Sequence, residues 1–197
     1  MKTNSTIKTV AQRQAGAFTL IEMIGVLAVI AILAALLIPK VTSAISDARV
    51  NSTVGSYQTV QTAASSHYSK YNSFNAMFTT NATTAELGAW DTGVLIPEGF
   101  LDQPFAAKIG NGNAVIHVVA GGGNAGGTGY KLDGVNVLTT NNAYTVECVI
   151  TNVATQDAYD VATRLDGSLA PAAPGVLTGG RVVYDGTNAM YMYVAGR

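Results

Sequence analysis

Glu22 stands out among the residues that could do chemistry, because it is a carboxylate inside an apolar segment. The segment runs from Phe18 to Ile38, and all its residues except Thr19 and Glu22 are apolar or small. As a helix it would span about 30 Å, the thickness of a bilayer core. A carboxylate there costs about 2.5–3.5 kcal/mol even on a lenient insertion scale, so it needs a partner. The sequence therefore predicts a membrane helix with one functional carboxylate.

The other titratable residues form no catalytic or metal-binding pattern. His67 and His117 have no His, Cys or carboxylate at a spacing typical of metal ligands, so we expect each to be hydrogen-bonded or solvated. No nucleophile belongs to a recognisable catalytic motif. We therefore expect no catalytic residues and a protein that is not an enzyme.

Four aspartates leave a calcium site as an alternative to the absence of a metal. Asp157 and Asp160 share a face of a predicted helix, and Asp133 and Asp166 precede glycines in turns. Calcium prefers such oxygen ligands, but no stretch has the ligand spacing of a calcium-binding loop. Turn formation is the better explanation, so we expect no metal and no cofactor.

The glycine-rich run 121–129 and the single cysteine have structural interpretations. A phosphate-binding loop needs Lys after its last Gly, but Gly129 leads into Tyr130, so we expect a flexible hairpin loop. With one cysteine, Cys148, no intramolecular disulfide is possible. We expect Cys148 to be buried as a small apolar residue, and an intermolecular bridge is the alternative.

Composition and charge indicate one small domain attached to the membrane helix. Of 197 residues, 12% are charged, and the net charge is −1. This leaves no basic surface for a specific nucleic-acid partner. Residues 1–17 carry three cations and no acid, so this end is expected in the cytoplasm and the C-terminal domain outside. An ordinary secretory signal peptide, cut near Ala44, is the alternative.

The segment from Gly16 to Glu22, Gly-Ala-Phe-Thr-Leu-Ile-Glu, followed by the apolar run and Pro39, resembles the N-terminus of a type IV pilin or pseudopilin. In that family a prepilin peptidase removes a short basic leader before the Phe, and the new N-terminus is methylated. The mature chain then has Glu at its fifth position and Pro at its twenty-second. Counted from Phe18, Glu22 is fifth and Pro39 is twenty-second.

The resemblance implies cleavage between Ala17 and Phe18 and N-methylation of Phe18. The family usually has Gly directly before the Phe, whereas Ala17 stands there in this chain. Ala is small enough for a protease subsite shaped for Gly, and this cut keeps both spacings. Cleavage between Gly16 and Ala17 is the alternative, and it would make Glu22 the sixth residue.

The resemblance also implies partners and a location. The free amine of Phe18 is expected to pair with Glu22 of a neighbouring subunit in a homo-oligomeric filament, which sets the register of assembly. The partners are then the prepilin peptidase and the assembly machinery of a pilus or a type II secretion system. Before assembly the chain would lie in the bacterial inner membrane with its head in the periplasm. Afterwards it would belong to an extracellular filament or a periplasmic pseudopilus.

The helix is predicted to continue beyond the apolar segment. Pro39 lacks an amide donor, so a kink is expected there. Apolar or aromatic residues then recur at spacings of three or four, which indicates one helical face. These residues are Val50, Val54, Tyr57, Val60, Ala64, Tyr68 and Tyr71. The predicted parts are a leader (1–17), a transmembrane and polymerisation helix (18–38), its continuation packing on the head (39–72) and a β-rich head (73–197).

The head is predicted to hold an antiparallel sheet and a short helix. Strand candidates are 94–96, 105–109, 114–120, 130–132, 143–150, 181–184 and 189–194. Residues 155–165 are expected to be a helix capped by Thr155. In 143–150 apolar side chains alternate with Thr145 and Glu147, so one face is expected to be buried. The fold class is thus α+β and pilin-like, with a long N-terminal helix, transmembrane in its first half, packed on an antiparallel β-sheet.

Three functions fit this sequence. The first is a type IV pilin, a structural subunit of a surface filament for adhesion, motility or DNA uptake. The second is a pseudopilin that forms a periplasmic piston in a type II secretion system. The third, which the missing catalytic pattern and the Glu22 spacing disfavour, is an extracytoplasmic enzyme or binding module anchored by a single span. The length of the head and the glycine-rich loop favour the pilin.

Overall fold

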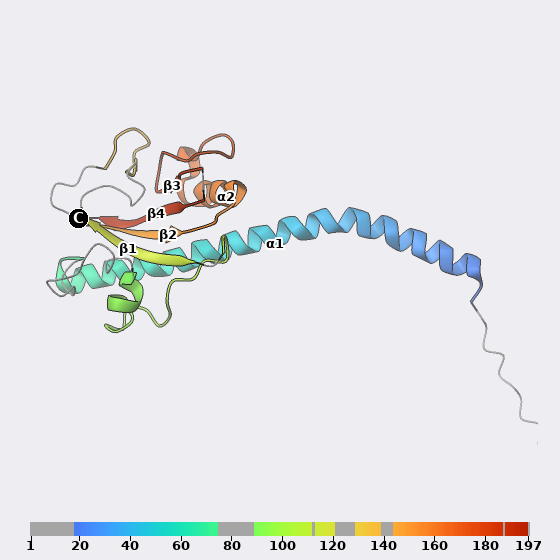
Figure 1. The fold of residues 1–197 in the computed structure, drawn as a ribbon, viewed down its shortest axis with the longest axis horizontal. Helices are drawn as coiled ribbons and strands as arrows, with labels where there is room; N and C mark the ends of the chain where they lie inside the picture. The colour runs from blue at the N-terminus through green and yellow to red at the C-terminus, as the bar shows by residue number, and fades with distance from the viewer. Residues whose placement is uncertain are drawn as a thin grey trace, which may run out of the picture. The chain divides into compact units, whose positions relative to one another are not determined.

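The computed structural model describes residues 18–74, 89–111, 113–120, 129–138, 144–186 and 188–196, so the predicted leader lies outside the described residues. The chain divides into two compact units, Met1–Ser43 and Ala44–Arg197. The elements in Figure 1 are helices α1 (Leu20–Tyr71) and α2 (Thr155–Asp166) and strands β1 (Ala114–Ala120), β2 (Tyr144–Ile150), β3 (Val182–Tyr184) and β4 (Met190–Gly196). A π-helical turn, η2 (Asp91–Leu95), and a 3-10 turn, η3 (Gly167–Leu169), complete them.

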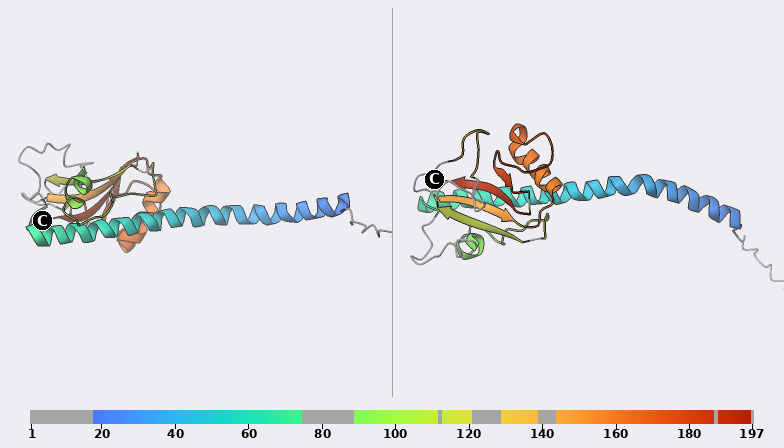
Figure 2. Two further views of the ribbon diagram at one scale, coloured as in Figure 1. Left: turned by 90° about the horizontal axis from the view of Figure 1, so that it is seen from below. Right: turned by 45° about the horizontal axis from the view of Figure 1, so that its top comes forward.

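The C-terminal part of α1 lies along one face of the sheet (Figure 2). Its buried residues are Val50, Thr53, Tyr57, Val60, Ala63, Ala64 and His67. The buried face is therefore rotated slightly from the predicted stripe, and Tyr68 and Tyr71 are only half-buried. Thr53 can be buried because its hydroxyl donates to the carbonyl of Arg49 at 3.0 Å and accepts from the amide of Lys108 at 3.0 Å.

The four described strands form one antiparallel sheet in the order β1-β2-β4-β3. β2 is central and pairs with β1 and β4, and β3 and β4 form the predicted terminal hairpin. Its turn is held by Asp185, whose carboxylate accepts hydrogen bonds from the amides of Asn188 and Ala189. A long N-terminal helix with a four-stranded antiparallel sheet confirms the predicted α+β, pilin-like fold class.

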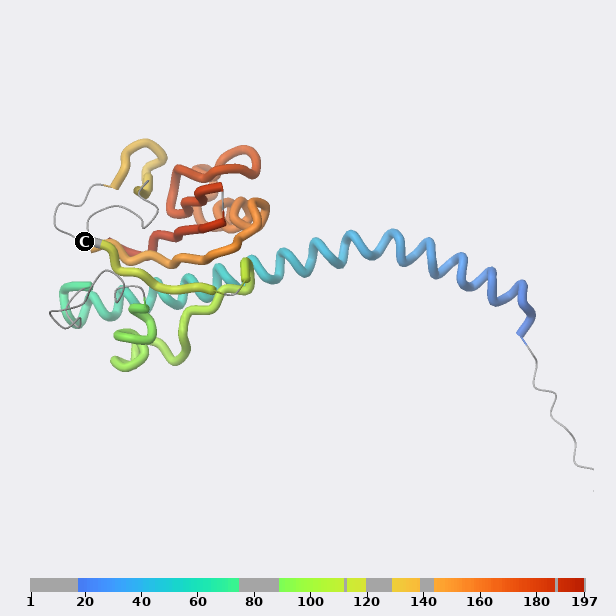
Figure 3. The backbone as a smooth tube through the Cα atoms, viewed as in Figure 1, coloured from blue at the N-terminus to red at the C-terminus, as the bar shows by residue number. Residues whose placement is uncertain are grey.

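Three of the strand predictions are wrong. Residues 94–96 belong to η2 and the turn after it, because a short apolar run fits a buried helical turn as well as a strand. Residues 105–109 are irregular because their amides bond to side chains and not to a neighbouring strand. The amide of Phe105 donates to Asp91, and the amide of Lys108 donates to Thr53. In 130–132 only Lys131 makes a bridge, to Gly180, before a turn follows. The 89–111 segment runs beside the C-terminal part of α1 (Figure 3).

α2 packs beside β3 and is joined to the start of the second unit through side chains of α1. Ala158, Val161 and Ala162 are buried, in line with the predicted apolar face. Thr155 does not cap the helix as expected: it is the first helical residue, and Ala154 is at the cap position without a side-chain bond. α2 is held instead by Arg164, which pairs with Asp47 at 2.8 Å.

β2 is buried on both faces, whereas the sequence predicted one. Glu147, on the face opposite Cys148, is fully buried because Tyr130 covers it and donates its hydroxyl to Oε2 at 2.6 Å. His117 is directly opposite on β1, with Nδ1 3.8 Å from Glu147 Oε1. The ring of Tyr130 also packs on that of Tyr193 of β4, with 5.4 Å between the ring centroids. Tyr130 therefore attaches the 129–138 segment to the sheet.

We predict that Tyr130→Phe lowers the free energy of unfolding by about 1–3 kcal/mol, because it removes a buried hydrogen bond to a carboxylate. Urea unfolding of the full chain in mild detergent, followed by the emission of the single tryptophan, Trp90, measures this change. Tyr159→Phe is the matched control, and equal stability of the two variants would contradict the prediction.

His67 lies in an aromatic cluster where the helix end meets the 89–111 segment. Its ring centroid is 4.8 Å from that of Tyr71, 5.0 Å from Trp90 and 5.5 Å from Phe100. The ring is fully buried, and neither of its nitrogens has a hydrogen-bond partner in the described part of the chain. The expectation of a hydrogen-bonded or solvated histidine is thus wrong for His67, which packs as an aromatic ring.

Burial lowers the pKa of His67, with Glu98 opposing this shift and Lys70 adding to it. The unfolded chain therefore binds the proton better, and stability should fall as the pH drops below the unfolded pKa of about 6.5. We predict that the loss of stability between about pH 7.5 and about pH 5.5 is smaller in His67→Phe than in the wild type. Urea midpoints at both pH values measure it, and an identical loss in both proteins would refute it.

Candidate assembly site

The residues of the predicted assembly site lie at the start of α1. Gly16 and Ala17 fall outside the described residues, so the cut before Phe18 and its alternative both stay predictions. Phe18 precedes the helix, which begins at Leu20. The side chain of Phe18 is 81% exposed. Glu22 is thus in the first turn of α1.

Glu22 forms a capping box with Thr19. The amide and the hydroxyl of Thr19 both donate to Glu22 Oε2 at 2.8 Å, and the Glu22 amide donates to Thr19 Oγ1 at 3.3 Å. These bonds satisfy donors that the first turn of a helix leaves free. Thr19 is therefore a site residue that our sequence analysis missed, although the Thr-x-x-Glu spacing before an apolar run is the signal for this motif.

One oxygen of Glu22 remains available after capping. All three bonds of the capping box use Oε2 and the Thr19 groups, and Oε1 has no partner within the described residues. A carboxylate has about four lone-pair positions, so capping does not exhaust its capacity. With this arrangement, Glu22 can cap its own helix and still accept a hydrogen bond from a cationic donor.

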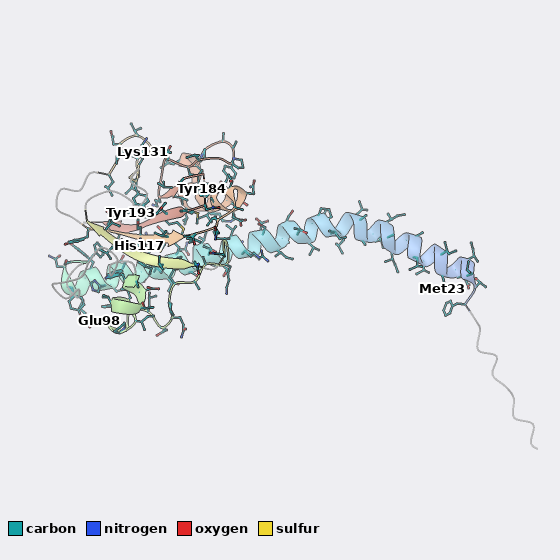
Figure 4. The ribbon with its side chains drawn as sticks, viewed as in Figure 1. Met23, Glu98, His117, Lys131, Tyr184 and Tyr193 are labelled. Carbon is teal, nitrogen blue, oxygen red and sulfur yellow. The ribbon has the colours of Figure 1, made fainter. Side chains whose placement is uncertain are left out.

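The apolar segment around Glu22 is not covered by the described residues of its own unit. Figure 4 shows side chains projecting on all sides of this part of α1, with Met23 near its start. The exposed large side chains are Phe18, Leu20, Ile21, Met23, Ile24, Val26, Leu27, Val29, Ile30, Ile32, Leu33, Leu36, Leu37 and Ile38. Among the described residues, α1 is the one helix long and apolar enough to cross a membrane, and none of its apolar window is buried.

α1 continues through Pro39 without interruption. The hydroxyls of Thr42 and Ser43 donate to the carbonyls of Ile38 and Pro39, each at 3.0 Å. Such bonds back to the preceding turn often accompany bending of a helix. The kink at Pro39 itself stays a prediction.

The two histidines and the cysteine belong to the second unit. His117 is half-buried beside Glu147, and His67 is in the aromatic cluster. Cys148 is fully buried as expected, and burial raises the pKa of its thiol well above the usual value. In the part of the chain that the structure describes, no three His, Cys, Asp or Glu side chains are grouped to hold a metal ion.

The four aspartates considered for calcium have separate structural roles. Asp157 accepts from the Ser46 hydroxyl, and Asp160 accepts from Gln156 on its own helix. Asp133 forms the expected turn, where bonds from the amides that follow it lower its pKa to about 2. The carboxylate of Asp166 accepts from two amides at the start of β3, at 2.7 and 3.0 Å.

Comparison with known protein families matches residues 12–38 to the family described as the prokaryotic N-terminal methylation motif. Comparisons with curated proteins and with solved structures found no match. The motif implies processing by a prepilin peptidase and assembly into the filament of a pilus or a secretion system. With the exposed apolar helix it is consistent with anchoring in a membrane. Residues 12–38 of this chain thus carry the prokaryotic N-terminal methylation motif, the hallmark of type IV pilin and pseudopilin prepilin-like proteins.

Proposed function

We propose that the chain is a type IV pilin, cleaved between Ala17 and Phe18, N-methylated at Phe18 and polymerised through its N-terminal helix into a surface filament. The filament would serve adhesion, motility or DNA uptake. The precursor would wait in the bacterial inner membrane with its head in the periplasm. The chain would act as a structural subunit without catalytic residues, since the methylation-motif family is usually not enzymatic. We expect it to need no metal and no cofactor.

The geometry of Glu22 is the observation that carries this proposal. Its Oε2 closes the capping box, and its Oε1, which has no partner among the described residues, could accept a further donor. Cleavage would create a free amine on Phe18, and burial of an ammonium next to a carboxylate lowers the desolvation cost of both. The pair of Glu22 with the amine of a neighbouring copy would set the register. Contacts among the exposed apolar segments would supply most of the cohesion.

The same chemistry serves a pseudopilin of a type II secretion system, which would form a periplasmic piston. A head of more than a hundred residues and the glycine-rich run 121–129 favour a pilin. Residues 121–128 lie outside the described residues, so the predicted hairpin loop stays a prediction. The location of the polymer distinguishes the two functions. Shearing of the cells releases a surface pilus, whereas a pseudopilus stays in the periplasm.

We predict that Glu22→Leu still inserts into the membrane and is cleaved, but fails to enter filaments. Glu22→Gln should fail as well, because an amide can replace the carboxylate in the capping box but carries no charge. The measurement is the amount of processed subunit in sheared filaments relative to the amount in the membrane fraction.

Thr19→Ala is the matched control for capping, since it weakens the capping box but keeps the carboxylate. It should assemble at a reduced level. Filaments from Glu22→Gln at the wild-type level would show that Glu22 acts only as a cap, and would refute the charged pair.

We predict that protein from sheared surface material begins at an N-methylated Phe18. N-terminal sequencing and intact mass measure the cut and the methyl group together. A chain that begins at Ala17 would support the alternative cut. A chain that begins at Ile45, or that occurs only as a soluble monomer, would identify an ordinary signal peptide and overturn the proposed function.

A further inference from the structure

The aromatic cluster around His67 contains three buried polar atoms that make no hydrogen bond. They are both ring nitrogens of His67 and Nε1 of Trp90, and none of them has a partner within the described residues. The two residues are each 0% exposed, and their ring centroids are 5.0 Å apart. Buried polar groups are nearly always hydrogen-bonded, so three such atoms in one cluster require an explanation.

The His67 ring joins the C-terminal end of α1 to residues 90–100. It meets Trp90 and Phe100 of that segment in T-shaped contacts, with interplanar angles of 75° and 70°. The same segment has a separate attachment to α1 further along the chain, where the amide of Lys108 donates to Thr53 Oγ1. The contact at His67 can therefore open while residues near Lys108 stay attached to the helix.

The charged and titratable groups around His67 are bonded to other partners. Those of α1 are Lys70 and Tyr71, and those of the facing segment are Asp91 and Glu98. Asp91 accepts a hydrogen bond from a backbone amide at 3.0 Å. Glu98, beside the C-terminal end of α1 (Figure 4), accepts from Lys70 Nζ at 3.1 Å and from the Tyr71 hydroxyl. Neither carboxylate accepts a hydrogen bond from His67.

This environment suits a neutral imidazole and not a charged one. Protonation makes both ring nitrogens donors, and a buried charge without acceptors is costly. Burial lowers the pKa of His67 more than the attraction of Glu98 raises it, and Lys70 adds repulsion. Water offers acceptors to the ring once the contact opens. The open contact therefore binds a proton better than the closed one, and acid favours opening.

We propose that His67 is an acid-sensitive latch, and that its protonation releases residues 90–100 from the C-terminal end of α1 and exposes Trp90. We call this the His67 latch. An ordinary histidine pKa of about 6.5 in the open form, with no protonation of the closed form, sets a limit of about tenfold on the gain in the opening constant between about pH 7.5 and about pH 5.5. The latch goes beyond the proposed function, because its residues belong to the second unit and take no part in the pairing of Glu22.

Hydrogen exchange of the full chain in mild detergent, followed by mass spectrometry at both pH values, tests this proposal. Exchange rates of the amides in residues 90–100, divided by the intrinsic rate at each pH, should rise at the lower pH by up to about tenfold. At both pH values these amides should exchange faster than those of β2 and β4, because local opening exposes them without global unfolding.

His67→Phe should abolish the acceleration, because phenylalanine fills the same site and cannot be protonated. His117→Phe is the matched control, since it removes the second histidine of the head and should leave the acceleration in residues 90–100 unchanged. Unchanged emission of Trp90 at pH 7.5 verifies that the heads of both variants are folded.

The wild type by itself can overturn the proposal, so the test does not depend on the folding of a variant. Equal corrected exchange of residues 90–100 at both pH values would refute the His67 latch. Exchange there no faster than in β2 and β4 would show that only global unfolding exposes the segment, and would refute it too. An acceleration of the same size in His67→Phe would assign the acid sensitivity to another group.

Discussion

The helix α1 must be stable in two environments, an apolar one along its first part and the packed head along its second part. The rest of the structure depends on the contacts that α1 makes in each. Up to Ile38 its side chains are apolar on every face, which suits lipid or neighbouring apolar helices and gives no preferred side. From Val50 on, only one face is buried, and the other carries Ser, Thr and Gln. The single carboxylate of the apolar part lies in the first helical turn, where it accepts hydrogen bonds from the amide and the hydroxyl of Thr19.

The head has a small core and no intramolecular disulfide, so other interactions must stabilise it. Its segments without regular structure are held by side chains that bond to distant backbone amides. Asp91 fixes Phe105, Thr53 fixes Lys108, and Asp166 fixes the start of β3. Each of these bonds satisfies a buried or half-buried polar group and at the same time positions a loop against the helix or the sheet. The loops of the head are therefore as dependent on polar side chains as the core is on apolar ones.

Charge in this protein is sparse and locally placed. In the described chain, Glu22 accepts hydrogen bonds through Oε2, and Oε1 has no partner there. Two ion pairs of the head, Lys70 with Glu98 and Arg164 with Asp47, join α1 to the segments around it. Charges inside the head thus stabilise its own packing.

The sequence alone determined the apolar segment, the isolated Glu22, the length of α1 and the alternating strands, because each is a pattern along the chain. It also contained the Thr19 and Glu22 spacing that we did not use. Only the tertiary structure decided the rest. Residues 105–109 form no strand because their amides bond to side chains far away in the sequence, and Glu147 is buried because Tyr130 reaches it from another segment. The chain at Lys108 meets α1 because its amide donates to Thr53 Oγ1. The periodicity of a sequence indicates which side of a helix or strand is apolar. It does not indicate which distant polar group will form hydrogen bonds with the other side.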